Sequence, residues 1–272
     1  PNKRLEGKVA IVTGASRGIG RAVALAFARE GAAVVVAAKS EQPKPTLPGS
    51  IHTVAAEIES AGARALPIKV DVRNDEDVHR MVALTMERLG RIDILVNNAG
   101  APGSLDRTLV VDLPEESWDT VLDTNLKGTF ITSQAVARSM LERGVRGRII
   151  SMSSQWGKKG GARRAAYCAS KFGIIGFTQS LAQELASAGI TVNAICPSAA
   201  ETERLDHMGL RADGSFDAAQ RAERIKQTGA ATPLGRIARP SDVAEVAAFL
   251  AGDAAEYITG QSINVTGGGV MH

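Results

Sequence analysis

The feature that most constrains the fold is a regular alternation of short apolar runs with longer segments of helical spacing. Short apolar runs bounded by turn residues predict strands, and segments whose apolar residues recur every three or four positions predict helices. Strands that alternate with helices are typical of βαβ units, whose right-handed crossovers place helices on both faces of a parallel sheet. We therefore predict an α/β fold with one doubly wound parallel sheet of about seven strands.

Each element of this pattern has a predicted residue range. Strands are expected at 8–13, 33–38, 65–70, 92–96, 148–152, 191–195 and 262–265. Helices are expected at 18–30, 51–61, 75–89, 115–143, 165–187 and 241–251. The irregular stretches are 39–50, 100–114, 155–164 and 197–217. None of these stretches resembles a linker between separate cores, so we expect residues 1–272 to form a single domain.

Composition argues against several classes of partner. The formal net charge of +3 is small, and the Lys and Arg residues are scattered, so we expect no nucleic acid. No apolar run is long enough to span a membrane, and residues 1–10 lead into a strand without a visible signal peptide. Two cysteines, Cys168 and Cys196, predict a reducing, cytoplasmic compartment and small buried side chains rather than a disulfide framework. No metal site is expected.

A glycine-rich turn, TGASRGIG at residues 13–20, lies between the first strand and the first helix. In this position Gly14 permits a tight turn, and Gly18 lets the backbone approach a pyrophosphate. Gly20 allows the helix to pack closely on the strand. The free amides of the helix N-terminus favour an anionic phosphate. The turn predicts a dinucleotide site, and the alternative is an ordinary strand-to-helix connection.

A second motif, YCASK, places Tyr167 and Lys171 four residues apart on a predicted helix, and therefore on one face. An ammonium beside a phenol favours the phenolate and lowers the pKa of the tyrosine. Such a phenol is suited to general acid or base catalysis. Taken alone, a Tyr and a Lys at this spacing also occur on many helices without a catalytic role.

Polar residues follow the strands that lead toward this helix. Ser154 lies beyond the end of strand 148–152, where open α/β sheets bind ligands, and Ser151 and Ser153 are alternatives. The segment Asn98-Ala99-Gly100 ends the fourth strand at the same sheet edge. Asn125 lies inside a predicted helix, where asparagine is unfavourable unless it is exposed or specifically bonded.

These motifs, in this order, resemble the short-chain dehydrogenase/reductase family over almost the whole chain. The resemblance implies a Rossmann-type sheet, and its spacing of thirteen residues before the tyrosine selects Ser154. It implies that Tyr167 exchanges a proton with the carbinol oxygen and that Ser154 polarises the carbonyl. Lys171 would lower the tyrosine pKa and bind the nicotinamide ribose, and Asn125 would hold a water in a proton relay.

The resemblance also implies a set of cofactor contacts. These are Gly14, Ser16, Arg17, Gly18, Ile19, Gly20, Asp71, Val72, Asn98, Ala99, Gly100, Tyr167, Lys171, Pro197 and Thr202. One departure from the family pattern follows the sixth strand, where Pro-Gly is usual and this chain has Pro197-Ser198. A serine fits there without strain if its φ angle stays negative.

The end of the second strand bears on cofactor choice. An acid about 20 residues past the glycine turn would bind a ribose 2′-hydroxyl and select NAD(H), but this chain has Lys39 there. Lys39 and Arg17 are suited to a 2′-phosphate, so we predict NADP(H), with NAD(H) as the alternative. Glu41 is the nearest acid that would favour NAD(H). Prolines 43, 45 and 48 are expected to stiffen the following loop.

The segment 197–230 is expected to cover the substrate, with Leu205 and Met208 as apolar lining and Trp156 as a second wall. These residues suggest a mostly apolar alcohol, ketone or aldehyde. The proline-containing loop resembles that of hydroxysteroid dehydrogenase-like proteins and terpenoid alcohol dehydrogenases within the family. A 3-oxoacyl thioester reductase is an alternative, and a non-catalytic dinucleotide sensor is a third. Helix 165–187 is apolar nearly all round, which predicts a homodimer or homotetramer.

Overall fold

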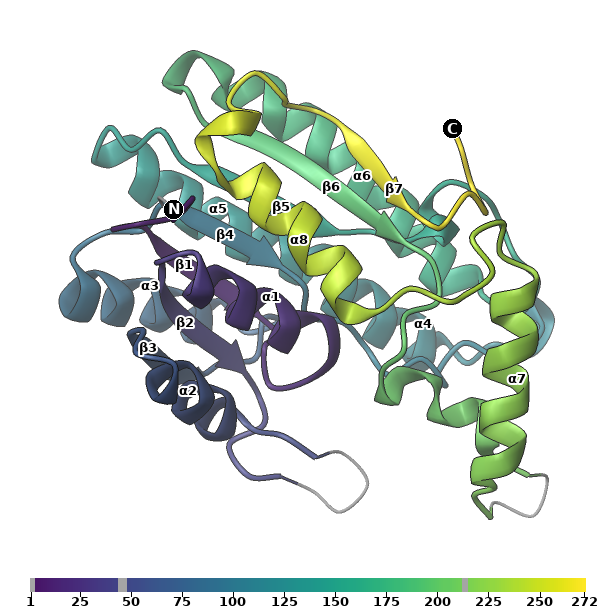
Figure 1. Ribbon diagram of the computed structural model, residues 1–272. Coiled ribbons are helices and arrows are strands. Elements are labelled where there is room, and N and C mark those ends of the chain that lie inside the picture. The colour runs from purple at the N-terminus through teal and green to yellow at the C-terminus, as the bar shows by residue number, and fades with distance from the viewer. Residues whose placement is uncertain (1–2, 44–47, 212–214) are drawn as a thin grey trace.

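The computed structural model describes residues 3–43, 48–211 and 215–272, and a seven-stranded parallel sheet lies at its centre (Figure 1). The strands are β1 (Val9–Thr13), β2 (Ala33–Ala38), β3 (Ala65–Lys69), β4 (Ile94–Asn97), β5 (Arg148–Met152), β6 (Thr191–Pro197) and β7 (Ser262–Val265). Their order across the sheet is β3-β2-β1-β4-β5-β6-β7. The predicted α/β fold, a doubly wound parallel sheet, is confirmed.

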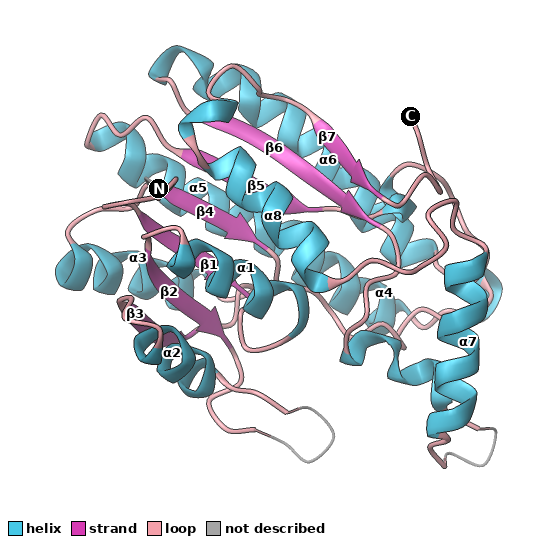
Figure 2. Cartoon of the chain, viewed as in Figure 1, coloured by secondary structure: helices cyan, strands magenta, loops and turns pink. Residues whose placement is uncertain are grey.

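Helices cover both faces of the sheet (Figure 2). One layer contains α1 (Gly18–Arg29), α2 (Ile51–Ser60) and α8 (Pro240–Ala251). The other contains α3 (Asp75–Leu89), α5 (Gly128–Glu142) and α6 (Ala165–Leu185). Two further helices, α4 (Glu115–Leu122) and α7 (Ala218–Ala230), lie near the edge where the strands end. In the described ranges no helix combines the length and apolar character needed to cross a membrane.

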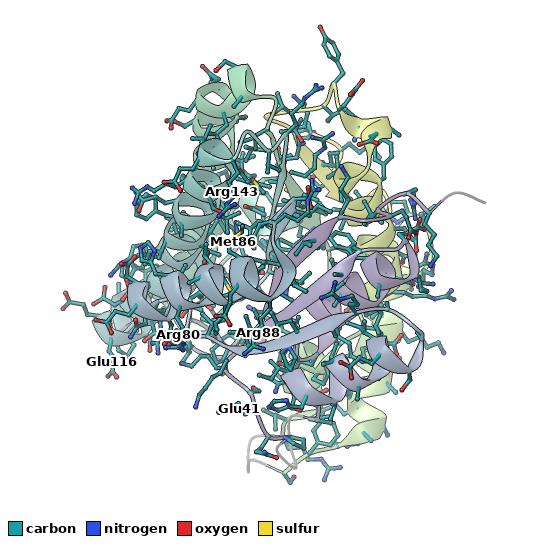
Figure 3. The ribbon with its side chains drawn as sticks, turned by 90° about the vertical axis from the view of Figure 1, so that its left-hand side faces the viewer. Glu41, Arg80, Met86, Arg88, Glu116 and Arg143 are labelled. Atoms are coloured by element: carbon teal, nitrogen blue, oxygen red, sulfur yellow. The ribbon has the colours of Figure 1, made fainter. Side chains whose placement is uncertain are left out.

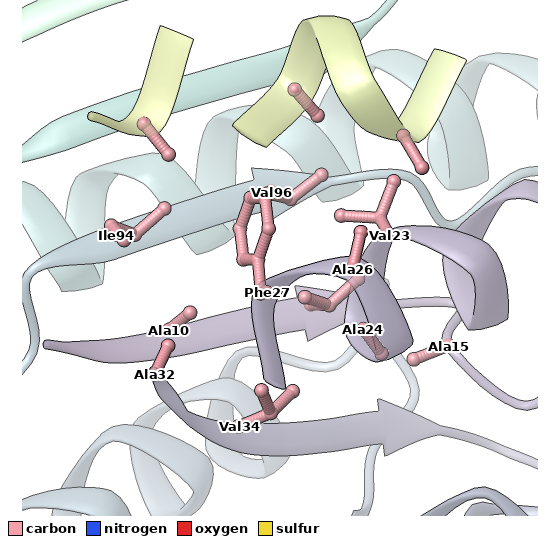
Figure 4. Packing of buried hydrophobic residues seen from close by; sticks show 14 of the residues in the cluster. Ala10, Ala15, Val23, Ala24, Ala26, Phe27, Ala32, Val34, Ile94 and Val96 are labelled. Atoms are coloured by element: carbon pink, nitrogen blue, oxygen red, sulfur yellow. The ribbon is translucent and has the colours of Figure 1, made fainter. Parts of the chain in front are cut away.

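The core forms because neighbouring strand residues point to opposite faces. In β1, Ala10 and Val12 join the cluster beneath α1 and α8, whereas Ile11 joins the cluster beneath α3, α5 and α6. Phe27 of α1 is fully buried in the first cluster, next to Val96 of β4 (Figure 4). Strands covered on both faces need continuous apolar runs, and β1, β2 and β4 have such runs.

The order of the strands determines where a ligand site can form. The chain passes from β1 outward to β2 and β3, then returns to place β4 on the other side of β1. The connections after β1 and β4 therefore diverge to opposite faces and leave a crevice at the carboxyl ends of the strands. Every predicted site motif lies at this edge or on a helix that reaches it.

The predicted helix 115–143 is interrupted in the structure. Between α4 and α5 the chain makes a five-residue π-helical turn, Asp123–Lys127, with Asn125 at its centre. Apolar spacing could not reveal this wider turn, because the helix axis continues through it. Single π turns are frequent at functional sites.

Helix α7 was not predicted from the sequence. Its start is capped by Asp217, whose carboxylate accepts a hydrogen bond from the Gln220 backbone amide at 3.0 Å. Only Gly229 is buried along its length, so α7 lies mostly on the surface. Apolar residues such as Ala218, Ala222 and Ile225 recur at helical spacing, but they are few among polar and charged neighbours. The outer surface of α3 is also polar: Arg80 and Arg88 on this helix are exposed to solvent (Figure 3).

Candidate active site

A cavity of about 470 Å³ opens at the carboxyl edge of the sheet. Its wall is built by the connections that follow β1, β4, β5 and β6, together with the first turns of α6 and the segment after β6. Of the residues predicted from the sequence, it contains Gly14, Gly18, Ile19, Asn98, Ala99, Gly100, Asn125, Ser154, Trp156, Tyr167, Lys171, Pro197, Thr202, Leu205 and Met208. Residues from distant parts of the chain therefore meet in one place.

The remaining predicted residues lie outside the cavity wall. They are Ser16, Arg17, Gly20, Lys39, Asp71 and Val72. Ser16, Arg17 and Gly20 belong to the turn after β1 and the start of α1, whereas Lys39 and Asp71 follow the ends of β2 and β3. Val72 is buried, and its side chain lies 2.7 Å from where a Cβ on Gly128 of α5 would be.

The glycine-rich turn has the geometry that a phosphate requires. Gly14 and Gly18 have φ angles of +65° and +55°, in the left-handed region that favours glycine. Helix α1 begins without a side-chain cap and without an acidic residue in its first turn, whereas Ser50 caps α2. The first amides of α1 are therefore left for another acceptor, and an anion is the group they favour. The turn fits the pyrophosphate of a dinucleotide.

A hydroxyl that the sequence analysis did not single out holds this turn against β4. The Thr13 Oγ1 atom accepts hydrogen bonds from the backbone amides of Asn98 at 3.0 Å and Ala99 at 3.1 Å. The Asn98 side-chain amide in turn donates to the backbone oxygens of Thr13 at 3.0 Å and Gly14 at 3.2 Å. These bonds fix the two turns relative to each other, and no local pattern in the sequence indicates such long-range pairing.

The candidate catalytic residues lie together on α6 and in the connection after β5. The Lys171 Nζ atom is 5.6 Å from the centre of the Tyr167 ring and donates a hydrogen bond to the Met152 backbone oxygen at 2.6 Å. A hydrogen bond also joins the side chains of Ser154 and Tyr167. The side chains of Lys171, Tyr167 and Ser154 thus lie close together, with Ser154 and Lys171 buried.

The electrostatics of this group lower the pKa of the phenol. Burial alone would raise the pKa of Tyr167, but the charges of Lys171 and Arg204 and the bond to Ser154 lower it below its usual value of 10. Burial also lowers the pKa of the Lys171 ammonium, against the opposing effect of Tyr167. A phenol with a depressed pKa exchanges its proton closer to neutral pH.

The three candidate serines have different surroundings. Ser151 accepts a hydrogen bond from the Asn97 side chain at 3.3 Å, and Ser153 donates to the Lys171 backbone oxygen at 2.9 Å. The Ser154 hydroxyl accepts from the Trp156 amide at 3.2 Å and also bonds Tyr167 at the cavity wall. Ser154 is therefore the serine that reaches the phenol.

Asn125 is buried and specifically bonded rather than exposed. Its Oδ1 atom accepts from the Ala101 amide at 2.9 Å, and its Nδ2 atom donates to the Ser170 hydroxyl at 2.9 Å. The side chain thus joins the connection after β4 to α6, beside Tyr167. Holding a water for proton transfer remains a prediction for this residue.

The ends of β2 and β3 form a separate charged cluster. The Lys39 Nζ atom lies 3.0 Å from the Asp71 carboxylate, which also pairs with Arg73 at 2.8 Å. Hydrogen bonds from Arg73, with a further contribution from Lys39, hold the pKa of Asp71 well below its usual range. Arg17 donates to the Ser40 hydroxyl at 3.0 Å, and its buried Nε atom has no partner among the described residues.

The loop after Lys39 returns to the glycine-rich turn. A Cβ on Gly49 would lie 2.4 Å from the Ser16 backbone oxygen, so this end of the loop packs directly on the turn. Glu41 forms an ion pair with Lys69 at 2.7 Å, and Figure 3 labels its position. Pro45 lies outside the described residues.

The connection after β6 accommodates its serine without strain. Among the described non-glycine residues only Arg163 has a positive φ angle, so Ser198 adopts ordinary backbone geometry in place of the family's glycine. Its backbone amide donates to the Val265 oxygen at 3.1 Å. Cys196, on the preceding strand, is buried like Cys168, and burial raises the pKa of both thiols.

The substrate side of the cavity is more charged than the sequence suggested. Trp156, Leu205 and Met208 line it as expected. Three arginines also line it, Arg107, Arg164 and Arg204, together with Asp106 and His207. Arg107 and Asp106 lie in a connection without periodic structure, so only the folded chain reveals that they face the site.

Comparison with known proteins agrees with this geometry. The family model described as short chain dehydrogenase matches residues 8–211. The chain is 41% identical over 268 residues to a sorbitol dehydrogenase of Cereibacter sphaeroides, covering 98% of this chain and 99% of that protein. It is also 41% identical over 268 residues to a 3-oxoacyl-[acyl-carrier-protein] reductase of Synechocystis sp., covering 98% of each.

Among solved structures, a short-chain type dehydrogenase/reductase from Mycobacterium marinum superposes with a TM-score of 0.86 at 35% identity. The match covers 98% of this chain and 97% of that one. Sequence similarity and fold both extend over nearly the whole molecule. The chain therefore belongs to the short-chain dehydrogenase/reductase family, whose members are oxidoreductases acting on alcohol and carbonyl groups.

Proposed function

We propose that this chain is an NADP(H)-dependent oxidoreductase that interconverts an alcohol with a ketone or aldehyde, with Tyr167 as general acid and base. The observation that carries the proposal is that Ser154 bonds Tyr167 and that the Lys171 ammonium lies 5.6 Å from the Tyr167 ring, on the wall of a cavity beside the glycine-rich turn. A non-catalytic sensor has no use for a phenol with a depressed pKa.

Each residue of the chain has a defined part in this proposal. The Ser154 hydroxyl donates to the substrate oxygen and orients it toward Tyr167. The phenol donates its proton to that oxygen during reduction, and the phenolate accepts the proton during oxidation. The positive charge of Lys171 stabilises the phenolate, and Asn125 holds the water that connects the site to solvent. When bound, the nicotinamide ring supplies or accepts the hydride.

The preference for NADP(H) rests on charge at the adenosine end. Lys39 and Arg17 lie where β2 and the glycine-rich turn end, and a 2′-phosphate is the group that pairs with such cations. Glu41, the acid closest to this position in the sequence, is paired with Lys69. Asp71, Val72, Asn98, Pro197 and Thr202 complete the proposed cofactor contacts, as the family resemblance implies.

Replacing Tyr167 with Phe tests the catalytic assignment. The variant should lose a factor of about 10² to 10⁴ in kcat, the usual contribution of a general acid or base, while the Kd for NADPH changes less than about threefold. Tyr257→Phe is the matched control, because the other tyrosine is fully exposed. Normal turnover by Tyr167→Phe over a panel of alcohols and carbonyl compounds would remove the assignment.

Replacing Lys39 with Asp tests the cofactor assignment. A unit charge about 4 Å from a phosphate contributes about 1 kcal/mol in water, and Lys39 is largely exposed, so reversing its charge costs about 2 kcal/mol. The Kd for NADPH should rise about 30-fold, and that for NADH by much less. Lys226→Asp, on the exposed face of α7, is the control. Equal losses for both cofactors would contradict the proposal.

The second candidate function is reduction of a 3-oxoacyl thioester. It is favoured by the name of the Synechocystis relative and by the arginines around the cavity. A screen of NADPH consumption with ketones, aldehydes and 3-oxoacyl thioesters distinguishes the two functions.

We also propose that the chain forms a homodimer or homotetramer. Phe130 of α5 and Phe172 of α6 are exposed by 44% and 46%, and Phe130 packs edge-on against Phe177 at 6.2 Å. Aromatic side chains on adjoining outer helix faces are typical of buried interfaces. Sedimentation at micromolar concentration tests this assembly, and a monomer would contradict it.

A further inference from the structure

We propose that the substrate carries an anionic group, held by Arg107, Arg164 and Arg204 on the wall of the cavity. This inference rests on the proposed function and names its substrate class: a short carbonyl or hydroxy compound with a carboxylate or phosphate. It replaces the expectation of a mostly apolar substrate, which considered only Trp156, Leu205 and Met208.

The three guanidinium groups converge from separate parts of the chain. Arg107 lies in the connection between β4 and α4, Arg164 immediately precedes α6, and Arg204 lies in the 3₁₀ helix Glu203–Gly209 after β6. All three line the cavity. The pKa of Arg107 is lowered by burial and then by the charges of Arg164 and Arg204, which places the three cations within electrostatic range of each other.

Two of the three guanidinium groups are held by a backbone oxygen and still keep hydrogen-bond donors available. Arg107 uses its Nε atom to donate to the Gly103 oxygen at 2.7 Å, and Arg204 uses Nη1 to donate to the Ala101 oxygen at 2.9 Å. Since a guanidinium has five N–H donors, most remain for a ligand. Such planar, preorganised groups are suited to carboxylates and phosphates.

Aromatic stacking fixes the orientation of two of these groups. The Arg164 guanidinium lies 4.9 Å from the centre of the Trp156 ring. The Arg204 guanidinium lies 5.2 Å from the centre of the Tyr167 ring. Stacking on a ring face uses no N–H donor. Because Arg204 lies over the proposed acid and base, the anionic group binds close to the reacting carbon.

The charges of these arginines are only partly balanced within the protein. Over the described residues, none of the three forms an ion pair with a carboxylate. Of the two acids on the cavity wall, Asp106 accepts a hydrogen bond from the Tyr167 backbone amide at 2.8 Å, and its charge offsets part of the charge of Arg107. Glu203 lies toward the glycine-rich turn, 3.7 Å from where a Cβ on Gly18 would be. A ligand anion supplies the missing partner.

Binding of an unreactive anion tests the site without depending on turnover. Glutarate and its uncharged analogue glutaramide are titrated calorimetrically into the wild-type protein saturated with NADP⁺. Glutarate should bind at least tenfold more tightly than glutaramide, and Arg107→Gln and Arg164→Gln should each weaken glutarate binding at least tenfold. Equal binding of the two probes would overturn the proposal.

Arg163→Gln is the matched control. It removes the same charge from the same loop, but Arg163 is exposed and does not line the cavity. Its glutarate affinity should stay within about threefold of wild type. A loss as large as that of Arg164→Gln would mean that only the general positive potential matters, and would overturn the site.

Kinetics then identify the source of the anion. A higher kcat/KM for 4-oxopentanoate than for 4-oxopentanamide indicates a small carboxylic acid. A higher kcat/KM for the 3-oxobutanoyl thioester of coenzyme A than for that of N-acetylcysteamine indicates a carrier phosphate. If glutarate binds but the protein reduces no carbonyl compound with NADPH, the proposed function fails and the anion site stands. If neutral compounds react and glutarate does not bind, only the anion site fails.

Discussion

Replacing Gly20 with Ala tests whether close packing of α1 on β1 determines both stability and cofactor binding. A Cβ at this position would lie 2.3 Å from the Gly14 oxygen and 2.4 Å from the Asn98 Nδ2 atom. Ordinary contact begins near 3.4 Å, so the backbone of the turn must move by about 1 Å. Overpacking of this kind costs about 1–3 kcal/mol.

The same displacement breaks the hydrogen bonds from Asn98 to the Thr13 and Gly14 oxygens, each contributing about 1 kcal/mol. We therefore expect the free energy of unfolding to fall by about 3–5 kcal/mol. For a chain of this size that lowers Tm by about 5–9 °C. The Kd for NADPH should rise at least tenfold, because the moved turn no longer presents its amides to phosphate.

Thermal unfolding and fluorescence titration with NADPH measure the two effects. Gly176→Ala in α6 is the control, since a Cβ there would contact nothing within 4 Å. That variant should be neutral or slightly stabilised, as expected for replacing a helical glycine with alanine. If Gly20→Ala kept both the Tm and the Kd of the wild type, the packing argument for the turn would be refuted.

Two further predictions concern the phenol and the core. In Arg204→Gln, the loss of a positive charge raises the pKa of Tyr167, so the rise of alcohol oxidation with pH should move to higher pH in a pH–rate profile. The sign follows because oxidation needs the phenolate, which forms above the pKa; an unchanged or lower midpoint would contradict it. Phe27→Ala should lower the free energy of unfolding by about 3–5 kcal/mol in a denaturant titration, because the fully buried ring leaves a cavity. A loss below 1 kcal/mol would show that the core repacks around the gap.

The sheet could be predicted because its five inner strands, β1, β2, β4, β5 and β6, are buried along nearly their whole length. A short apolar run such as Val34-Val35-Val36 favours a strand because its residues are β-branched, and all three are fully buried. The order of the motifs along the chain then predicted that Tyr167, Lys171 and the glycine-rich turn belong to one site. These motifs can be recognised from the sequence because the residues of each are spaced along a single helix or a single turn.

The substrate side could not be predicted in the same way. Arg107 and Arg204 lie in connections without periodicity, and their convergence depends on how separate loops fold over the sheet edge. Helix α7 was missed because its apolar residues, such as Ala222 and Ile225, are few within a mostly polar and charged segment. The π turn at Asn125 depends on bonds to Ala101 and Ser170, which are distant in sequence. Tertiary contacts, rather than local propensity, decide these features.

The position of Trp156 between two cations gives the molecule an internal optical reporter. Its ring lies 5.5 Å from the Lys159 ammonium and 4.9 Å from the Arg164 guanidinium. Indole emission responds to charge beside the ring, so an occupant that draws Arg164 away changes the fluorescence of this residue. The only other tryptophan, Trp118, lies on α4 and gives a separate signal that Trp118→Phe removes. Binding of an anion at the proposed site would therefore be observable in the unlabelled protein, before any chemistry takes place.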